Sequence, residues 1–387
     1  MSSVLGTYAR KAISFTKGEG SFLYTEKGDK YLDWIAGIAT NILGHCHPHV
    51  SKAIQDQSKK LIHVSNAVII KEAESLAKRI TDNTFADKVF FCNSGAESVE
   101  GAIKIVRRYF HTIGKPEKNR LVSFSGAFHG RTLAALFLAN NKSHTEGFGP
   151  KVDGFDQVPF SDHEALKKAI NKNTAAIICE PVQGEGGVKV VPDYCLKGLR
   201  EICDEHGVLL VFDSIQVSFR AGTLLGFENS GISPDICCVA KGFGNGFPIG
   251  AILLTNEVAK GMTHGSHGST FGNNLLACAA AHAVLDIVLA TGFFEEVKTK
   301  GKYFDNELKK LKDSFPKIIE EVRGINFIKG LKLKVDIGDF MSKLMKNKLL
   351  VVKAAENCIR LFPSLLSTTD ELDMGIKIIK KTCEEMS

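Results

Sequence analysis

The sequence predicts an α/β protein in which helices cover both faces of a mainly parallel sheet. Short runs of continuous apolar or β-branched residues alternate with amphipathic helical stretches. Continuous apolar strands are typical of a sheet that is buried on both faces. The predicted strands are KVFFCNS (88–94), RLVSFSG (120–126), TAAIICEPV (174–182), VLLVFD (208–213), DICCVAK (235–241) and GAILLTN (250–256).

Helical patterns lie between and after these strands. Apolar residues recur at helical spacing in AESVEGAIKIVRRYF (96–110) and in YCLKGLREICDEHG (194–207), and a long helical run, LLACAAAHAVLDIVLAT, occupies 275–291. Ligands of such sheets bind beyond the carboxyl ends of the strands. The residues that end the strands are therefore the first candidates for a site.

The two ends of the chain follow a different pattern. SFLYTEKGDKYLDWIAG (21–37) alternates across a KGDK turn, which predicts a hairpin. Beyond residue 291 we expect a helix, a hairpin at EVRGINFIKGLKLK (321–334), a helix, a strand and a final helix. We assign 1–50 and 292–387 to one smaller domain and 51–291 to a large domain.

Composition excludes several classes of protein. Lys and Arg exceed Asp and Glu by only 49 − 43 = 6. The densest basic stretch, 298–317, interleaves acids at helical spacing, so it predicts a solvated helix face rather than a nucleic-acid groove. No apolar run is long enough to cross a bilayer, and the N-terminus lacks a signal-peptide core. We therefore expect a cytoplasmic protein without a nucleic-acid or membrane partner.

The ten cysteines indicate buried thiols rather than disulfides, because several lie inside apolar strands. GHCHPH (44–49) offers four potential metal ligands, His45, Cys46, His47 and His49. Neighbouring ligands in one turn cannot all converge on one ion, and no second cluster completes the set. We therefore predict a loop and no metal site.

Asp213 poses the central question, because it ends a strand that is predicted to be fully buried. A buried carboxylate is costly unless a cation or strong donor meets it, and the local sequence supplies neither. Lys241 ends another strand 241 − 213 = 28 residues later. A lysine there can condense with a carbonyl compound, and a carboxylate on a neighbouring strand can hold a pyridinium nitrogen. Pyridoxal phosphate has both groups, so its ring N–H⁺ is the partner that we predict for Asp213.

Two further motifs suit the same ligand. NSGAES (93–98) joins a strand to a helix, so the amides of Gly95 and Ala96 offer an anion site for the phosphate. AFHGRTL (127–133) brings an aromatic ring, an imidazole and a guanidinium to one loop. There Phe128 can stack on a ring, and Arg131 can bind a carboxylate. A core Phe and a surface Arg are the plainer interpretations of this loop by itself.

Taken together, the motifs resemble one family over almost the whole chain. NSGAES, AFHGRTL, EPVQGEGG (180–187), FDSIQ, VAKGFGNGFPIGA and GSHGSTFG (265–272) occur in the order and at the intervals of class III pyridoxal-phosphate aminotransferases. The resemblance implies fold type I, with a mainly parallel seven-stranded sheet in the large domain. AGIATNILGHCHPHV and KLIHVSN most resemble the acetylornithine aminotransferases, whose own loop is GHCHP.

The resemblance implies roles for the cofactor residues. Lys241 is the expected lysine of the cofactor linkage and the proton shuttle, and Asp213 the partner of the pyridinium nitrogen. Gln216 is expected near the phenolic oxygen and Phe128 on the ring. The phosphate is expected on Gly95 and Ala96, and on Thr270 of a second subunit, which implies a homodimer with shared active sites.

It also implies how substrates bind. Arg360, in CIRLFPS, resembles the arginine that binds an α-carboxylate. Glu185 resembles the acid that screens Arg360 when the substrate has no carboxylate there, and Arg131 is expected to hold the distal carboxylate. The implied substrates are the amine donor N-acetylornithine and the acceptor 2-oxoglutarate.

Several positions depart from the family. DSIQVSFRAG has Ser214 where the family usually has Glu, has Ser218 in place of part of a glycine-rich turn, and has one residue fewer. Asn273 and Leu275 replace a common Gly and Pro, and Ala67-Val68 replace aromatic residues. These departures leave two alternatives open: a different ω-amine donor, such as ornithine, a succinylated amine or 4-aminobutyrate, and a non-catalytic homologue that acts by binding.

Overall fold

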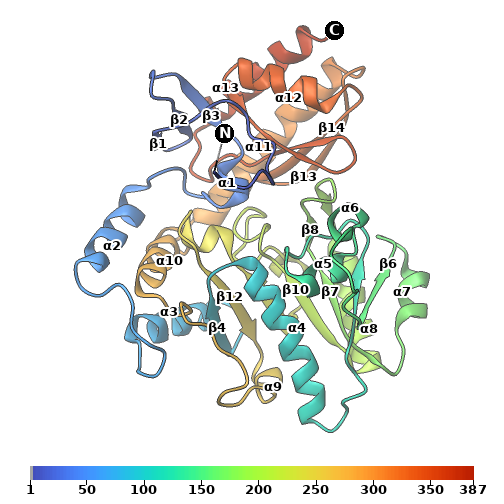
Figure 1. Ribbon diagram of the computed structural model, residues 1–387. Helices are drawn as coiled ribbons and strands as arrows, with labels where there is room; N and C mark the ends of the chain where they lie inside the picture. Colours follow the sequence, from blue (N-terminus) through green and yellow to red (C-terminus); the bar gives the residue numbers. More distant parts are fainter. Residues whose placement is uncertain (1–2) are drawn as a thin grey trace.

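The computed structural model describes residues 3–387 of the chain. Its largest layer is a seven-stranded sheet, seen in the lower half of Figure 1. The strands, in spatial order, are β4 (Lys88–Cys92), β12 (Gly250–Leu254), β11 (Ile236–Val239), β10 (Leu209–Asp213), β7 (Thr174–Cys179), β5 (Arg120–Phe124) and β6 (Phe155–Val158).

This sheet confirms the predicted fold class. β10 runs parallel to β7 and β11, β5 runs parallel to β7 and β6, and β12 is antiparallel to both of its neighbours. All six predicted strands form. The edge strand β6 has no counterpart among them, because FDQV is short and its two central residues are only partly buried.

Alternate residues of the central strands enter two different cores. Ile177, Leu210 and Phe212 pack with helices α8 (Asp193–His206) and α10 (Leu275–Val288). Ile178 and Val211 pack on the opposite face with α4 (Gly95–Thr112) and α5 (Leu133–Ala139). Both faces of the sheet are therefore buried, which explains the continuous apolar runs. The remaining elements of this half are α2 (Pro48–Ser58), α3 (Lys71–Thr81), α6 (Lys142–Thr145), α7 (His163–Ala169), β8 (Val182–Gln183), β9 (Lys189–Val190), η1 (Glu228–Ser230), η2 (Lys241–Gly244) and α9 (Asn256–Ala259).

The two ends of the chain meet in the upper half of Figure 1. The predicted hairpin forms from β2 (Phe22–Tyr24) and β3 (Lys30–Asp33), and β3 pairs in parallel with the C-terminal strand β15 (Leu349–Leu350). A second sheet has the strand order β13 (Ile319–Ile325), β14 (Ile328–Leu333), β17 (Cys358–Leu361) and β16 (Val352–Ala354). The domain boundaries near residues 50 and 291 stay a prediction.

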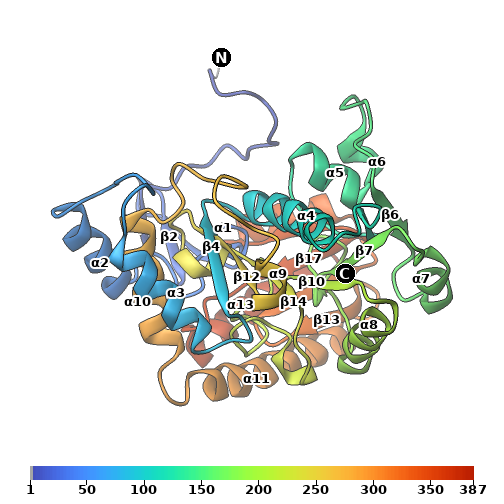
Figure 2. The same ribbon diagram turned by 90° about the horizontal axis from the view of Figure 1, so that it is seen from below.

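The C-terminal part has more strands than the sequence predicts. The single strand expected after residue 334 is three short ones, because the chain changes sheet after β15. Figure 2 shows the segment before β1 extending away from the rest of the chain. The bounds in this half are β1 (Lys17–Glu19), α1 (Ala36–Ala39), α11 (Phe293–Ser314), β13 (Ile319–Ile325), β14 (Ile328–Leu333), α12 (Ile337–Lys346), β16 (Val352–Ala354), β17 (Cys358–Leu361) and α13 (Thr369–Glu384).

Within residues 3–387, no one helix has the length and apolarity to span a membrane; α10 and α11 reach that criterion only as a pair bent by 73°.

Candidate functional site

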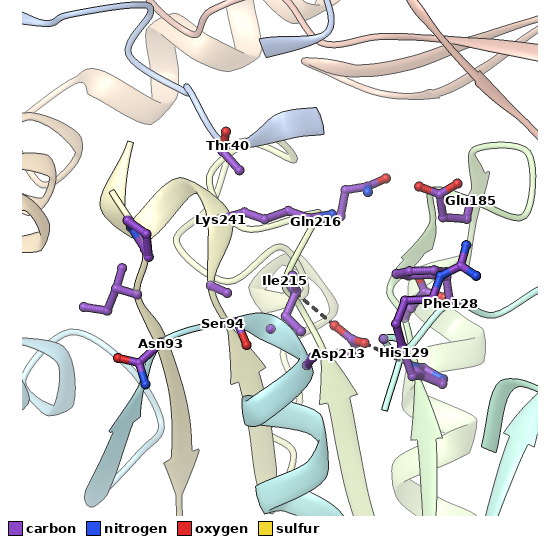
Figure 3. Close-up of a pocket in the computed structure, with 18 of the residues that line it drawn as sticks. Thr40, Asn93, Ser94, Phe128, His129, Glu185, Asp213, Ile215, Gln216 and Lys241 are labelled. Carbon is purple, nitrogen blue, oxygen red and sulfur yellow. Dashed lines mark hydrogen bonds and ion pairs between the residues drawn. The ribbon is translucent and has the colours of Figure 1, made fainter. Parts of the chain in front are cut away.

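A cavity of about 420 Å³ lies beyond the carboxyl ends of β7, β10 and β11. The position is the one expected for ligands of a parallel sheet. Eight of the ten predicted site residues line it, and Figure 3 shows side chains of several of them. These eight are Gly95, Ala96, Phe128, Arg131, Glu185, Asp213, Gln216 and Lys241.

Asp213 forms hydrogen bonds within this chain that its sequence does not predict. It is 4% exposed, and its Oδ2 lies 2.8 Å from Nδ1 of His129, while its Oδ1 accepts the Ile215 amide at 3.1 Å. Burial acts to lower the pKa of His129, but the hydrogen bond and charge of Asp213, aided by Glu180, outweigh it and raise that pKa. An acid–imidazole pair therefore forms the floor of the cavity (Figure 3).

Lys241 follows β11 by two residues, in the short helix η2, rather than ending the strand itself. Its φ of 44° lies in the left-handed region, a strained conformation that is common at functional sites. Its side chain extends into the cavity toward Gln216 (Figure 3). Burial, with the charge of Arg360, lowers the pKa of Lys241 to about 8. About a tenth of this amine is therefore neutral at pH 7, far more than for a lysine of ordinary pKa.

The N-terminus of α4 supplies the anion site. Ser94 caps the helix by accepting the Glu97 amide, and Gly95 and Ala96 follow it in the cavity wall. The first amides of a helix lack intrahelical acceptors, so they can bind an oxyanion. Gly95 is needed for space, because a Cβ there would lie 2.8 Å from the Ile215 side chain.

The AFHGRTL loop (127–133) brings the side chains of Phe128 and Arg131 together. The Arg131 guanidinium lies 5.4 Å from the centre of the Phe128 ring. It is also 3.3 Å from Nε2 of His144, whose pKa is lowered by partial burial and by Arg131. Arg131 is exposed at the edge of the cavity, where a second substrate group can reach it.

Arg360 does not line the cavity but lies directly behind residues that do. It is 2% exposed and forms an ion pair with Glu185, and it also donates to the Gln216 side chain at 3.3 Å and to the Lys353 carbonyl at 2.8 Å. The Glu185 side chain is 32% exposed, whereas that of Arg360 is 2% exposed. The predicted proximity of Arg360 and Glu185 is present in the structure.

Thr270 is, with Arg360, one of the two predicted residues that do not line the cavity. It is exposed, beside Ser269, which accepts a hydrogen bond from the Asn93 side chain. Thr270 does not line the cavity of its own chain, and the role predicted for it is at the phosphate site of a second subunit.

The residues that differ from the usual class III motifs lie at two places in the structure. Ser214 is buried below the cavity, and Ser218 donates to its carbonyl at 2.6 Å. Asn273 has a φ of 65°, which asparagine tolerates, and binds Asn66 beside the exposed Ala67-Val68 segment. Only the first of these places adjoins the cavity.

Three residues in and around the cavity make contacts that the sequence does not predict. His129 is named only as part of a loop, although it is the partner of Asp213. Glu180 directly follows β7, and Asp213 is the last residue of β10, so both acids come at the end of a buried apolar run. Arg220 is fully buried and donates to the carbonyls of Ala39, Phe327 and Pro363, contacts that no local pattern reveals.

The histidine-rich GHCHPH loop makes side-chain contacts of its own. His45 lies 2.8 Å from Asp33, and His49 lies 2.7 Å from Asp286. No group of three or more His, Cys, Asp or Glu side chains among residues 3–387 is arranged to hold a metal ion.

The cavity meets the chemical demands of pyridoxal phosphate. A partly neutral lysine amine faces the centre, a buried carboxylate lies on the floor, an aromatic ring lies at one side, and helix amides lie at another. The positive charge of Arg360 is balanced by Glu185. The residues present therefore fit the cofactor that the motifs imply.

Comparisons with known proteins agree with this fit. The family model "Aminotransferase class-III" matches residues 7–383. The acetylornithine aminotransferase of Agrobacterium fabrum is 49% identical over 382 residues, which cover 98% of this chain and 96% of that protein. The solved ornithine aminotransferase of Toxoplasma gondii has a TM-score of 0.95 at 29% identity, covering 99% of this chain and 93% of that one. The acetylornithine aminotransferase structure from Elizabethkingia anophelis has a TM-score of 0.88 at 30% identity, covering 99% and 96%. The chain therefore belongs to the class III family of pyridoxal-phosphate-dependent aminotransferases.

Proposed function

We propose that this enzyme transfers the δ-amino group of N-acetylornithine to 2-oxoglutarate in the cytoplasm, giving N-acetylglutamate 5-semialdehyde and glutamate. The reaction belongs to arginine biosynthesis. Relatives named acetylornithine aminotransferase are 46–49% identical over nearly the full chain, which supports this donor. The observation that carries the proposal is the buried Arg360 paired with the partly exposed Glu185, since one pocket must accept two differently charged substrates.

Pyridoxal phosphate, when bound, supplies an electron sink that lets an amino group pass from donor to acceptor. Nζ of Lys241 would hold the cofactor, and its amine would accept and donate the proton that the amino transfer requires. Its lowered pKa suits a group that must both accept and donate a proton near neutral pH. Asp213, oriented by His129, keeps the ring nitrogen protonated.

The remaining cofactor contacts follow from the cavity wall. Phe128 would stack on the ring, and the amides of Gly95 and Ala96 at the N-terminus of α4 would bind the phosphate. Gln216 would bind at the phenolic oxygen. Its side chain accepts from Arg360 at 3.3 Å, which supports a link between the cofactor and the substrate-binding arginine.

The two arginines account for both substrates. Arg131 holds the distal carboxylate that N-acetylornithine and 2-oxoglutarate share. Arg360 binds the α-carboxylate of 2-oxoglutarate, and Glu185 neutralises Arg360 while the amine end of N-acetylornithine occupies the pocket. Paired charge-assisted hydrogen bonds of this kind are among the strong contacts in proteins.

The proposal includes a homodimer. Asn66 donates to the Ser269 and Gly272 carbonyls, so the segments around 61–69 and 269–273 form one surface. That surface exposes several large apolar side chains and carries Thr270, which suits a contact with a second copy that receives Thr270 at its phosphate site. The apolar side chains are Leu61, Ile62, Val68, Ile69 and Phe271.

Oligomeric state and cofactor affinity together test the dimer. Light scattering should give twice the chain mass, and Thr270→Ala should weaken pyridoxal phosphate binding. A monomer that binds the cofactor equally well with either residue would contradict the shared site.

Borohydride reduction and peptide mapping test the cofactor linkage. The label should lie on Lys241, and Lys241→Ala should abolish turnover while some cofactor binding remains through the phosphate contacts. A label on another lysine would show that the assignment is wrong.

A screen of amine donors with 2-oxoglutarate as acceptor tests the substrate. N-acetylornithine should give the highest kcat/KM. Ornithine is the second candidate, supported by the structural similarity to the Toxoplasma gondii ornithine aminotransferase. Preference for ornithine would replace the proposed donor without changing the family.

A further inference from the structure

The loop between β5 and α5 carries Phe128, His129 and Arg131, but it has no strand or helix of its own. Parts of it are nevertheless deeply buried, since His129 is 2% exposed and Ala127 is 7% exposed. Buried backbone outside a helix or sheet needs hydrogen-bond partners from elsewhere. The position of the two rings therefore depends on what holds this loop.

Three side chains from beyond the loop hold it at successive points. The Gln183 side chain donates to the Ser125 carbonyl at 3.2 Å. The Phe128 amide donates to Oε1 of Glu180 at 2.9 Å, and the next residue, His129, lies 2.8 Å from Asp213. Two consecutive loop residues are thus bound by two acids.

The two acids are neighbours by strand register. Phe212 on β10 pairs with Cys179 on β7, so the following residues, Asp213 and Glu180, leave the sheet side by side. Glu180 is 6% exposed and lines the same cavity as Asp213. The roles proposed for the cofactor and substrate residues do not use this second buried acid.

We propose that Glu180 is a positioning residue of this active site: by binding the Phe128 amide it fixes the loop that presents the Phe128 ring to the cofactor and His129 to Asp213. The inference rests on the proposed use of pyridoxal phosphate in this cavity. Glu180 itself need not touch the cofactor, because its effect passes through the loop.

The protonation of Glu180 agrees with this role. Burial raises the pKa of Glu180 to about 8, and Asp213 adds to that increase. The charges of His129 and Lys241, and the Phe128 amide, act in the opposite direction. The raised pKa increases the uncharged share of this carboxyl at neutral pH, and in that form its carbonyl oxygen can accept the amide as a glutamine side chain would.

Matched variants separate the hydrogen bond from the charge. Glu180→Gln keeps an acceptor of the same size, Glu180→Ala removes it, and Glu201→Ala on the exposed face of α8 is the control. At pH 7, we expect Glu180→Ala to raise the dissociation constant of pyridoxal phosphate by about tenfold or more and to lower kcat more than it raises KM. Glu180→Gln should recover most of both losses. Equal behaviour of the Gln and Ala variants, or wild-type behaviour of the Ala variant, would overturn the proposal.

A second measurement needs neither cofactor nor substrate. An acid with a raised pKa in the folded state binds a proton that the unfolded state has lost, so its contribution to stability falls as pH rises from about 4.5 toward 8. The thermal midpoint of Glu180→Gln apoprotein should therefore rise relative to wild type between pH 5 and pH 8. Parallel curves would overturn the buried placement of this acid, even if the Ala variant fails to fold. A donor other than N-acetylornithine would change neither result, so failure of the proposed substrate is distinguishable.

Discussion

Two buried arginines near the cavity show how different partners give one side chain different tasks. Arg360 is 2% exposed and Arg220 is 0% exposed, and both guanidinium groups lie near the Phe362 ring, at 5.7 and 5.3 Å from its centre. Arg360 is paired with a carboxylate on a partly exposed side chain. Arg220 is bound by main-chain carbonyls.

The difference lies in whether the partner can move away. The carbonyls that bind Arg220 come from three separate segments, around residues 39, 327 and 363, and each is fixed by its own backbone. Glu185 is partly exposed, and the proposed function requires it to turn toward solvent and leave Arg360 to a substrate carboxylate. A buried charge with a movable partner suits binding, whereas a buried charge held by main chain suits structure.

Asp213 resembles Arg360 rather than Arg220. It is buried and bound by His129, but it also lines the cavity. Asp213→Asn should lower turnover about a thousandfold in both half-reactions while the fold stays intact, because the ring nitrogen would lose its charged partner. Steady-state kinetics and circular dichroism measure the two quantities. Near-native turnover would mean that Asp213 is only a structural residue at a strand end.

Arg220 should behave in the opposite way. Arg220→Ala should reduce the free energy of unfolding of the apoprotein by about 3 kcal/mol, because three carbonyls and a large side chain lose their contacts. Any loss of activity should be equal for the two substrates. Urea unfolding measures the first quantity, and a loss below about 0.5 kcal/mol would remove the distinction between the two arginines.

The smallest expected effect is on the pKa of Lys241. Arg360 is a cause of its decrease to about 8 and Glu185 opposes it, so Arg360→Met should raise this pKa and Glu185→Gln should lower it, each by about one unit or less. The rate of pyridoxal phosphate capture by apoprotein should increase with pH as Lys241 loses its proton. The midpoint reports the pKa.

Arg220→Lys serves as the control for this titration. Arg220 is not among the groups that shift Lys241, so the midpoint should stay at its wild-type value. If changes at Arg220 and at Arg360 shifted the pKa of Lys241 equally, the shift would come from a general disturbance of the structure and not from the charge of Arg360.

The sequence predicts the parts of the site that lie at the ends of buried strands. Asp213 and Lys241 stand out because a polar residue follows a continuous apolar run, and the parallel sheet brings both to one edge. The positions of Gly95 and Ala96 follow from a strand-to-helix junction in the same way. Local patterns are sufficient for these residues.

The contacts across long distances in the chain are not predictable in this way. His129 and Asp213 are 84 residues apart, and Arg220 binds carbonyls 107 to 181 residues away. The split into β15, β16 and β17 depends on pairing with β3 on one side and with β14 on the other. Local apolar patterns do not encode such pairings, so these features required the structure.

Single-turnover kinetics of the two half-reactions in Arg360→Ala tests the central claim most directly. We propose that Arg360 contacts a substrate carboxylate only when that substrate is 2-oxoglutarate or glutamate. We therefore expect that half-reaction to slow by about a hundredfold while the N-acetylornithine half-reaction changes little. Arg131→Ala, the comparison variant, should slow both. Equal losses in the two half-reactions of Arg360→Ala would contradict the exchange between Glu185 and substrate.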